Sequence, residues 1–361
     1  MTREEKLASI YRGGTVYRPL QEEKSILLEV QLGCSWHKCA FCDFTRDHFE
    51  MLPLEEVRRA AEILGELKVE GNRVFLLGQN PFCRSTSDLL HIFGYIHHYL
   101  PWVSEISMYA RADDILRKSP EDLRTLRQMG LRDLHVGVES GSDTVLLMAN
   151  KGETAADLLR AFHKLDEAGI QYLVTSILGL GGKQMWKSHA IETARLYNQI
   201  HPRNIWVLAL KLFPGTQLYR QASQGLFEPM TPWQMLREER LLVQCLEVQD
   251  CFYMDTTALN QYTLAAHLPD GKEGLLQAIH QLLVDEELPA QEKLPLGRWR
   301  HFKGGEYQVY GVAIHSETEE EYVVYRPLYG EGKLWIRPLS MWLEEVERDG
   351  KKQKRFTYIG E

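Results

Sequence analysis

A six-fold alternation of short apolar segments and amphipathic helices constrains the fold of this chain most strongly. The segments with strand character lie at residues 25–32, 73–77, 105–109, 133–138, 171–178 and 204–210. Helical periodicity separates them, at residues 54–69, 87–100, 120–129, 155–168 and 186–200. Strand, crossover helix and next strand in this order predict an α/β fold with a parallel sheet. A doubly wound sheet and a partial barrel both satisfy the pattern.

Polar or flexible residues follow most of these strands. Five of them are Cys34, Gly78, Arg111, Glu139 and Gly179. Ligands bind at the C-terminal ends of parallel strands in both architectures. We therefore expect the functional site at this edge of the sheet.

Three of the six cysteines lie in one loop, directly after the first strand. Cys34, Cys39 and Cys42 follow Gly33 with the spacing Cys-x4-Cys-x2-Cys. Three thiolates can hold one metal ion or one iron–sulfur cluster. A cluster that only transfers electrons normally has four cysteine ligands, so three ligands would leave one iron open to a substrate or cofactor.

A structural zinc site is the alternative for the same loop. His37 or His48 could complete it, but such sites usually pair two Cys-x2-Cys arms, and the sequence contains no second arm. On this alternative the chain would be a zinc-stabilised binding module that recognises RNA or a protein partner. The remaining cysteines, Cys83, Cys245 and Cys251, have no diagnostic spacing, and we interpret them as buried thiols.

The segment from Gly33 to Cys42, placed after the first strand of the repeat, resembles the radical S-adenosylmethionine (SAM) enzymes. Phe41, an aromatic residue just before the last cysteine, is typical of that family, whose commoner spacing is Cys-x3-Cys-x2-Cys. The resemblance covers roughly residues 14–285 and is also strong at residues 136–141. It implies a partial (β/α)6 TIM-like barrel with one [4Fe-4S] cluster on Cys34, Cys39 and Cys42. It further implies cleavage of SAM to methionine and a 5′-deoxyadenosyl radical, with an electron donor such as flavodoxin or ferredoxin.

The resemblance also indicates which residues contact SAM near the second and third strands. A Gly-Gly-Glu-like segment of the family receives the SAM amino group, and here it is Gly78, Gln79 and Asn80, without the carboxylate. An ordinary turn is the alternative for Gly78. Arg111 is a candidate partner of the SAM carboxylate, and a surface ion pair with Asp113 or Asp114 is its alternative.

Further along the chain, Glu139 and Ser140 are candidates for contacts with the ribose or the amino-acid head of SAM. A helix N-cap at Ser140 or Ser142 is the alternative. Leu178 and Gly179 resemble a family segment near the adenine, and Phe41 completes the predicted cofactor contacts. We interpret His135 and His189 as structural, and the sequence identifies no catalytic residue.

After Leu210 the alternation stops, and a helix is expected at residues 231–246. A helix is expected at 272–284, and residues 286–297, with two prolines and a glycine, predict a linker. We therefore divide the chain into a core (1–285), this linker and a small β-rich domain (298–361), which resembles a separate domain of unknown function. Trp299, Trp335 and Trp342 are expected to form its core.

Composition limits the partners. The chain has 361 residues, of which 44% are hydrophobic and 25% charged, and a formal net charge of −8. Such an acidic chain is a poor general binder of nucleic acid, so a small-molecule substrate is favoured. The sequence contains no long apolar run and no secretory leader, which favours a cytoplasmic protein without membrane association.

Overall fold

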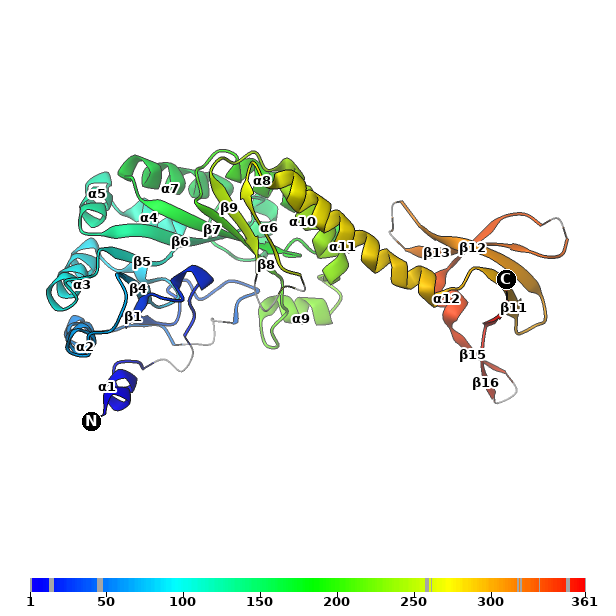
Figure 1. Cartoon of the computed structure of the whole chain (residues 1–361), viewed down its shortest axis with the longest axis horizontal. Coiled ribbons are helices and arrows are strands. Elements are labelled where there is room, and N and C mark those ends of the chain that lie inside the picture. The colour runs from blue at the N-terminus through cyan, green and yellow to red at the C-terminus, as the bar shows by residue number, and fades with distance from the viewer. Residues whose placement is uncertain are drawn as a thin grey trace. The chain divides into compact units, whose positions relative to one another are not determined.

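The computed structural model of the chain describes residues 2–12, 16–43, 48–256, 260, 262–316, 318, 320–330, 332–348 and 351–360, without the side chains of residues 285–293, 347, 348 and 351. Its contacts divide the chain into two compact units, Met1–Ile279 and His280–Glu361 (Figure 1). None of the described helices is long and apolar enough to cross a lipid bilayer. The predicted boundaries at 285 and 298 stay predictions.

The first unit is built on one eight-stranded sheet in the order β1-β4-β5-β6-β7-β8-β9-β10. Its strands are β1 (Ile26–Glu29), β4 (Arg73–Leu77), β5 (Glu105–Ala110), β6 (Leu131–Glu139), β7 (Gln171–Leu178), β8 (Asn204–Ala209), β9 (Cys251–Asp255) and β10 (Leu264–Leu268). Every neighbouring pair up to β9 is parallel, and β10 is antiparallel to β9. Because the spatial order follows the chain order without a reversal, the sheet is a partial barrel and not a doubly wound sheet. The six predicted strands are confirmed, and β9 and β10 extend them.

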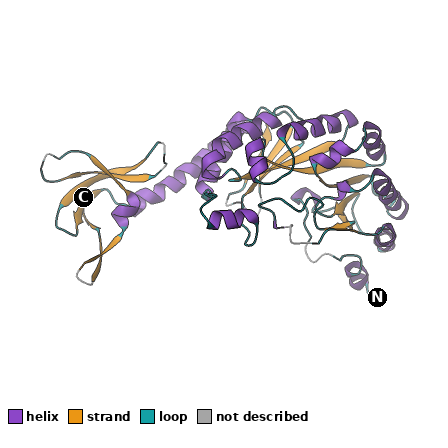
Figure 2. Cartoon of the chain, turned by 180° about the vertical axis from the view of Figure 1, so that it is seen from behind, coloured by secondary structure: helices purple, strands orange, loops and turns teal. Residues whose placement is uncertain are grey.

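Helices cover the outer face of this curved sheet (Figure 2). They are α2 (Leu54–Glu66), α3 (Thr86–Tyr99), α4 (Ala112–Arg117), α5 (Pro120–Gln128), α6 (Asp143–Met148), α7 (Ala155–Ala168), α8 (Gly182–Tyr197) and α10 (Pro232–Cys245). The unit also contains α1 (Arg3–Ala8), α9 (Gln217–Ser223), two single-turn helices, η1 (Leu20–Glu22) and η3 (Pro81–Cys83), and the short strands β2 (Gln31–Leu32) and β3 (Glu50–Met51). Strand residues such as Leu76, Met108 and Val174 are fully buried, as expected for the parallel strands of a curved sheet that helices cover.

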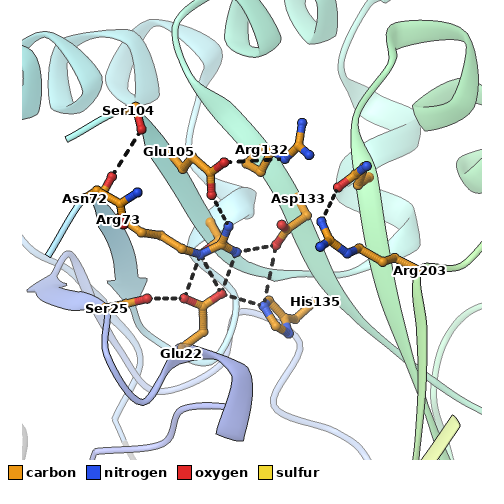
Figure 3. A network of polar contacts seen from close by, with 12 residues as sticks. Glu22, Ser25, Asn72, Arg73, Ser104, Glu105, Arg132, Asp133, His135 and Arg203 are labelled. Atoms are coloured by element: carbon orange, nitrogen blue, oxygen red, sulfur yellow. Dashed lines mark hydrogen bonds and ion pairs between the residues drawn. The ribbon is translucent and has the colours of Figure 1, made fainter. Parts of the chain in front are cut away.

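A buried ion network closes the N-terminal edge of the sheet (Figure 3). Glu22 has no exposed surface and accepts hydrogen bonds from Arg73 at 2.6 Å and from Ser107 at 2.8 Å. His135 lies 2.9 Å from the same carboxylate, and Arg73 also pairs with Asp133 at 2.6 Å. His135 is therefore part of the scaffold, as its interpretation as a structural residue expects.

The second unit contains a five-stranded antiparallel sheet in the order β14-β13-β12-β11-β17. Its elements are β11 (Gly297–His301), β12 (Glu306–Ile314), β13 (Glu321–Pro327), β14 (Trp335–Pro338), α12 (Leu339–Leu343), β15 (Glu345–Arg348), β16 (Lys351–Lys354) and β17 (Phe356–Gly360). Trp342 is fully buried and stacks on Phe356 with 3.8 Å between the ring centroids. Trp299 and Trp342 form the core as predicted, but Trp335 is 56% exposed, because it begins the short edge strand β14.

The helix before this sheet is longer than the sequence predicts. α11 (Lys272–Lys293) continues past residue 284, so residues 286–293 of the predicted linker are helical. The segment contains glutamate, glutamine, alanine and lysine, which favour helix, and these outweigh the single Pro289.

Candidate functional site

The cysteine loop leaves β2 at the C-terminal edge of the sheet. Gly33 begins it with φ of 63°, a left-handed conformation that glycine adopts without strain. Cys34, Cys39 and Cys42 are all half-buried. The loop is therefore folded against the barrel, and its three thiols are only partly exposed to solvent.

A segment that the sequence did not single out holds this loop. We call residues 149–153, which follow α6, the clamp segment. The amide of Ala40 donates to the carbonyl of Ala149 at 2.8 Å, and the Trp36 indole donates to the carbonyl of Asn150 at 2.8 Å. Asn150 in turn donates from Nδ2 to the carbonyl of Lys38 at 2.9 Å. The loop is thus fixed through both backbone and side chain.

Gly152 allows the closest approach in this clamp. Its φ is 75°, and a Cβ at this position would lie 2.2 Å from the Trp36 ring. No side chain larger than hydrogen fits there without moving the indole. Trp36 also contacts a cation, because the Arg111 guanidinium lies over the indole ring, 4.8 Å from the ring centroid.

Four buried charged residues gather beside the thiols: Arg111, Glu139, Lys151 and Glu153. Lys151 Nζ lies 3.7 Å from Glu139 Oε1 and 3.9 Å from Glu153 Oε2. Burial raises the pKa of the Cys39 thiol, and the positive charges of Lys151 and Arg111 oppose that rise. The structure therefore brings together the predicted residues Cys39, Arg111 and Glu139, and adds Lys151 and Glu153, whose only sequence signal is a pair of charges flanking a glycine.

Arg111 does make the ion pair considered as its alternative, but inside the protein and not on the surface. Its Nε donates to Asp113 at 3.0 Å, and its Nη2 donates to the carbonyl of Lys151 at 2.9 Å and lies 3.4 Å from Glu153. These contacts fix the guanidinium at the rim of the site.

The segment after β4 presents buried polar groups. Gly78 has φ of 147°, and a Cβ there would lie 2.7 Å from the Cβ of Gln31. Asn80 is fully buried, and its Nδ2 donates to Ser35 at 2.7 Å and to Asp114 at 2.6 Å. The side-chain oxygens of Gln79 and Asn80 are buried without a hydrogen-bond partner among the described residues.

Asp114 is a site residue that the sequence considered only as an ion-pair partner of Arg111. It lies on α4, 2.7 Å from Arg117, and its other carboxylate oxygen contacts Asn80. A carboxylate from the next β/α unit thus lies beside Gly78-Gln79-Asn80, which contains none. No motif marks Asp114, so only the structure identifies it.

Glu139 and Ser140 lie at the end of β6 in different roles. Glu139 has φ of 65° and accepts a hydrogen bond from Thr175 at 2.9 Å. Ser140 is fully buried and accepts from the amide of Ser142 at 3.0 Å, at the entry to α6. Ser142 is the N-cap residue of α6 without a capping side-chain hydrogen bond.

A hydrogen-bonded chain joins Glu139 to Gly179. The Gly179 amide donates to Glu238 at 2.6 Å, and His189 lies with Nδ1 2.6 Å from Glu238 and Nε2 3.1 Å from the Glu139 carbonyl. A carboxylate and a carbonyl only accept, so His189 donates from both nitrogens as an imidazolium. Burial lowers the pKa of His189, but Glu238 outweighs it and the pKa is raised.

Leu178 and Phe41 are the two remaining residues that the sequence predicts to contact SAM. Leu178 is the last residue of β7 and is buried. Phe41 packs, half-buried, against an apolar cluster that includes Ala40, Leu180 and Phe227. This packing ties the cysteine loop to the turn after β7.

One group of potential metal ligands lies away from the cysteine loop. Among the described residues, single ligand atoms of Glu22, Asp133 and His135 lie within 4.8 Å of one another. Arg73 pairs with both carboxylates of that group, so a guanidinium already supplies a positive charge there.

Known proteins match both units. A family model described as the radical SAM superfamily matches residues 28–194, and a model described as a protein of unknown function (DUF1653) matches residues 297–358. A crystal structure of a DUF1653 protein from Bordetella bronchiseptica is 37% identical, covers 20% of this chain and 94% of that chain, and has a TM-score of 0.19.

Two curated relatives match the first unit. The heme chaperone HemW of Bacillus subtilis (strain 168) is 25% identical over 200 residues, 52% of this chain and 51% of that protein. The tRNA-2-methylthio-N(6)-dimethylallyladenosine synthase of Methylacidiphilum infernorum (isolate V4) is 24% identical over 203 residues, 52% of this chain and 42% of that protein. The chain spans about half the length of these relatives or less. Residues 28–194, which include the cysteine loop and the strands β4 to β7, therefore form a domain of the radical SAM superfamily, whose enzymes use a [4Fe-4S] cluster and SAM, and residues 297–358 form a DUF1653 domain.

Proposed function

We propose that this protein binds a [4Fe-4S] cluster through Cys34, Cys39 and Cys42 and uses it to cleave SAM reductively, which starts radical chemistry on a small-molecule substrate. When bound, the cluster supplies the electron that breaks the SAM sulfonium into methionine and a 5′-deoxyadenosyl radical. One observation carries the proposal: three half-buried thiols share a sheet edge with the side-chain oxygens of Gln79 and Asn80, which are buried without a hydrogen-bond partner in the described part of the chain.

The residues after β4 and on α4 fit the ammonium group of SAM. The free oxygens of Gln79 and Asn80 accept hydrogen bonds, and Asp114 adds a negative charge beside Asn80. Burying unpartnered acceptors is costly, so a bound cation that satisfies them stabilises the site. Ser35 links this group directly to the loop that carries Cys34.

Other residues hold the rest of the cofactor on this proposal. Arg111 pairs with the SAM carboxylate through guanidinium N–H groups that Asp113 and Lys151 do not use. Glu139 accepts hydrogen bonds from the ribose, while Ser140 positions the turn below it through Ser142. Leu178, Gly179 and Phe41 form the apolar side of the site, toward the adenine.

The matched relatives and the net charge bear on the substrate and the partners. The matched relatives are described as a heme chaperone and a tRNA-modifying synthase, so they point to different substrate classes. The net charge of −8 favours a small molecule over nucleic acid. We further propose that flavodoxin or ferredoxin donates the electron, and that the protein acts in the cytoplasm, where thiols stay reduced.

Metal and sulfide analysis of protein purified without oxygen tests the proposal. We expect about four irons and four sulfides per chain, in line with one [4Fe-4S] cluster. Reduced protein supplied with SAM should then release methionine and 5′-deoxyadenosine in equal amounts. One zinc per chain with no sulfide would contradict the proposal and restore the binding-module alternative.

Replacing Asp114 with asparagine should weaken SAM binding without removing the cluster. A hydrogen bond to a charged group contributes about 1.5–3 kcal/mol, so we expect the Kd for SAM to rise about 10–100-fold. Equilibrium dialysis on cluster-loaded protein measures it. Arg117→Gln is the matched control, because it removes the ion pair to Asp114 and keeps the carboxylate. An Asp114→Asn protein that binds SAM as tightly as Arg117→Gln would exclude this role.

A further inference from the structure

The clamp segment places a lysine where buried lysines are rare. Lys151 is 5% exposed, and its neighbours Asn150 and Gly152 both contact the cysteine loop. An ammonium group that leaves water loses several kcal/mol of hydration unless other groups replace it. The contacts that hold the loop use the backbone of this segment, the Asn150 side chain and a glycine, and none of them uses the charge of Lys151.

Two carboxylates keep Lys151 charged. Glu139 lies at 3.7 Å and Glu153 at 3.9 Å, on either side of the ammonium. Burial lowers the pKa of Lys151, but these two carboxylates outweigh it. The lysine is therefore a fixed positive charge at neutral pH.

The clamp segment brings Lys151 to the cysteine loop. Its neighbour Asn150 donates to the carbonyl of Lys38, the residue before Cys39, and its neighbour Gly152 lies against the Trp36 ring. The positive charges of Lys151 and Arg111 favour the thiolate of Cys39, and the carboxylate of Glu139 opposes them. Arg111 donates to the carbonyl of Lys151, so the clamp segment also fixes the second cation. Two buried cations thus lie beside one proposed cluster ligand.

We propose that Lys151 sets the reduction potential of the cluster by compensating its charge. This inference rests on the proposed function, because it needs a cluster on the three cysteines. Three thiolates and a [4Fe-4S]2+ core have a net charge of −1, and one-electron reduction makes it −2. A nearby positive charge stabilises the more negative state, so it raises the reduction potential and makes the electron easier to load.

The test is the midpoint potential of the cluster in Lys151→Met, measured by an EPR-monitored redox titration without SAM. At a fixed potential we expect the ratio of reduced to oxidised cluster to fall about tenfold relative to wild type, a shift of 59 mV for a one-electron couple. Lys151→Arg keeps the charge and should titrate within a threefold ratio of wild type. Equal midpoints in Lys151→Met and wild type would overturn the inference.

A second variant separates charge from packing. The double variant Lys151→Met/Glu153→Gln removes one positive and one negative charge, so its local net charge equals that of wild type. Its midpoint should return toward the wild-type value, whereas a double variant that stays as low as Lys151→Met would assign the shift to altered packing and overturn the inference. If Lys151→Met loses iron, Glu153→Gln carries the same test, because it removes a negative charge 3.9 Å from the Lys151 ammonium and should raise the midpoint relative to wild type. An unchanged midpoint in Glu153→Gln would then overturn the inference.

The same titration distinguishes a failure of the proposed function from a failure of the role proposed for Lys151. If wild-type protein holds no [4Fe-4S] cluster, the proposed function fails first. If wild type holds the cluster and releases 5′-deoxyadenosine, but no Lys151 variant moves the midpoint, only the role of Lys151 fails.

Discussion

Cys39→Ala protein purified without oxygen should contain almost no iron and should release no measurable 5′-deoxyadenosine. Loss of a group that only supports a metal ligand typically lowers metal affinity 10–100-fold, so loss of the ligand itself should exceed about a hundredfold. The charges of Lys151 and Arg111 also favour the thiolate form of Cys39, the form that binds iron. Iron analysis and chromatography of the SAM products measure the two effects.

Cys83→Ala is the matched control. Cys83 lies in η3, near the same edge, and accepts a weak hydrogen bond from Gln31 at 3.7 Å. Burial raises the pKa of Cys83 to about 11, so it remains a neutral thiol. Cys83→Ala should keep its iron. If it loses iron as completely as Cys39→Ala, the assignment of ligands to the loop is incorrect.

Glu22→Gln should lower the free energy of unfolding of the barrel by about 3 kcal/mol at pH 7, because removing one member of a buried ion network leaves its partners uncompensated. Glu22 is fully buried and binds Arg73, Ser107 and His135. Glu105→Gln is the control, because Glu105 also pairs with Arg73 but is partly exposed. That substitution should lower the free energy by less than about 1 kcal/mol.

The effect of Glu22→Gln should depend on pH. Burial raises the pKa of Glu22, but hydrogen bonds from His135 and Arg73 outweigh it and hold the pKa well below its usual value. The stabilisation is therefore complete above the unfolded pKa of about 4.3 and is lost as pH falls toward the folded value. Urea denaturation between pH 7 and pH 3 should show the gap between wild type and Glu22→Gln narrowing below about pH 4. A gap that stays constant with pH would disprove the ionic explanation.

Local chemistry made much of the barrel predictable. Residues 155–168 and 171–178 were predicted at the bounds that α7 and β7 have. Thr154 and Asp157 cap each other's backbone at the start of α7, and Gly169 ends it with φ of 68°. Such caps are encoded within a few residues, so sequence alone locates them.

Tertiary contacts decided what the sequence missed. β9 and β10 have five residues each; β9 pairs with the edge of β8, and β10 then pairs with β9. Trp335 has the composition of a core residue, yet its strand lies at the edge of its sheet. No local signal distinguishes an edge strand from a central one.

The residues of the candidate site also fall into those that the sequence predicts and those that only the structure identifies. The loop cysteines and the residues at the strand ends were predictable, because parallel strands bring their C-terminal ends to one edge. Asp114 and Lys151 belong to a short helix and to a connecting segment, and their importance depends on contacts with Asn80 and Glu139. Those contacts join residues 34 and 12 positions apart in the chain.

The His189 chain has a consequence for how variation can reach the site. Glu139 and Gly179 end different strands, and His189 and Glu238 connect them through α8 and α10. Gly179 and Glu238 are 59 positions apart in the chain. The packing of α8 and α10 therefore fixes the positions of the two strand ends relative to each other. A change in how α10 packs on α8 alters the geometry of the rim while leaving every residue of the cysteine loop as it is.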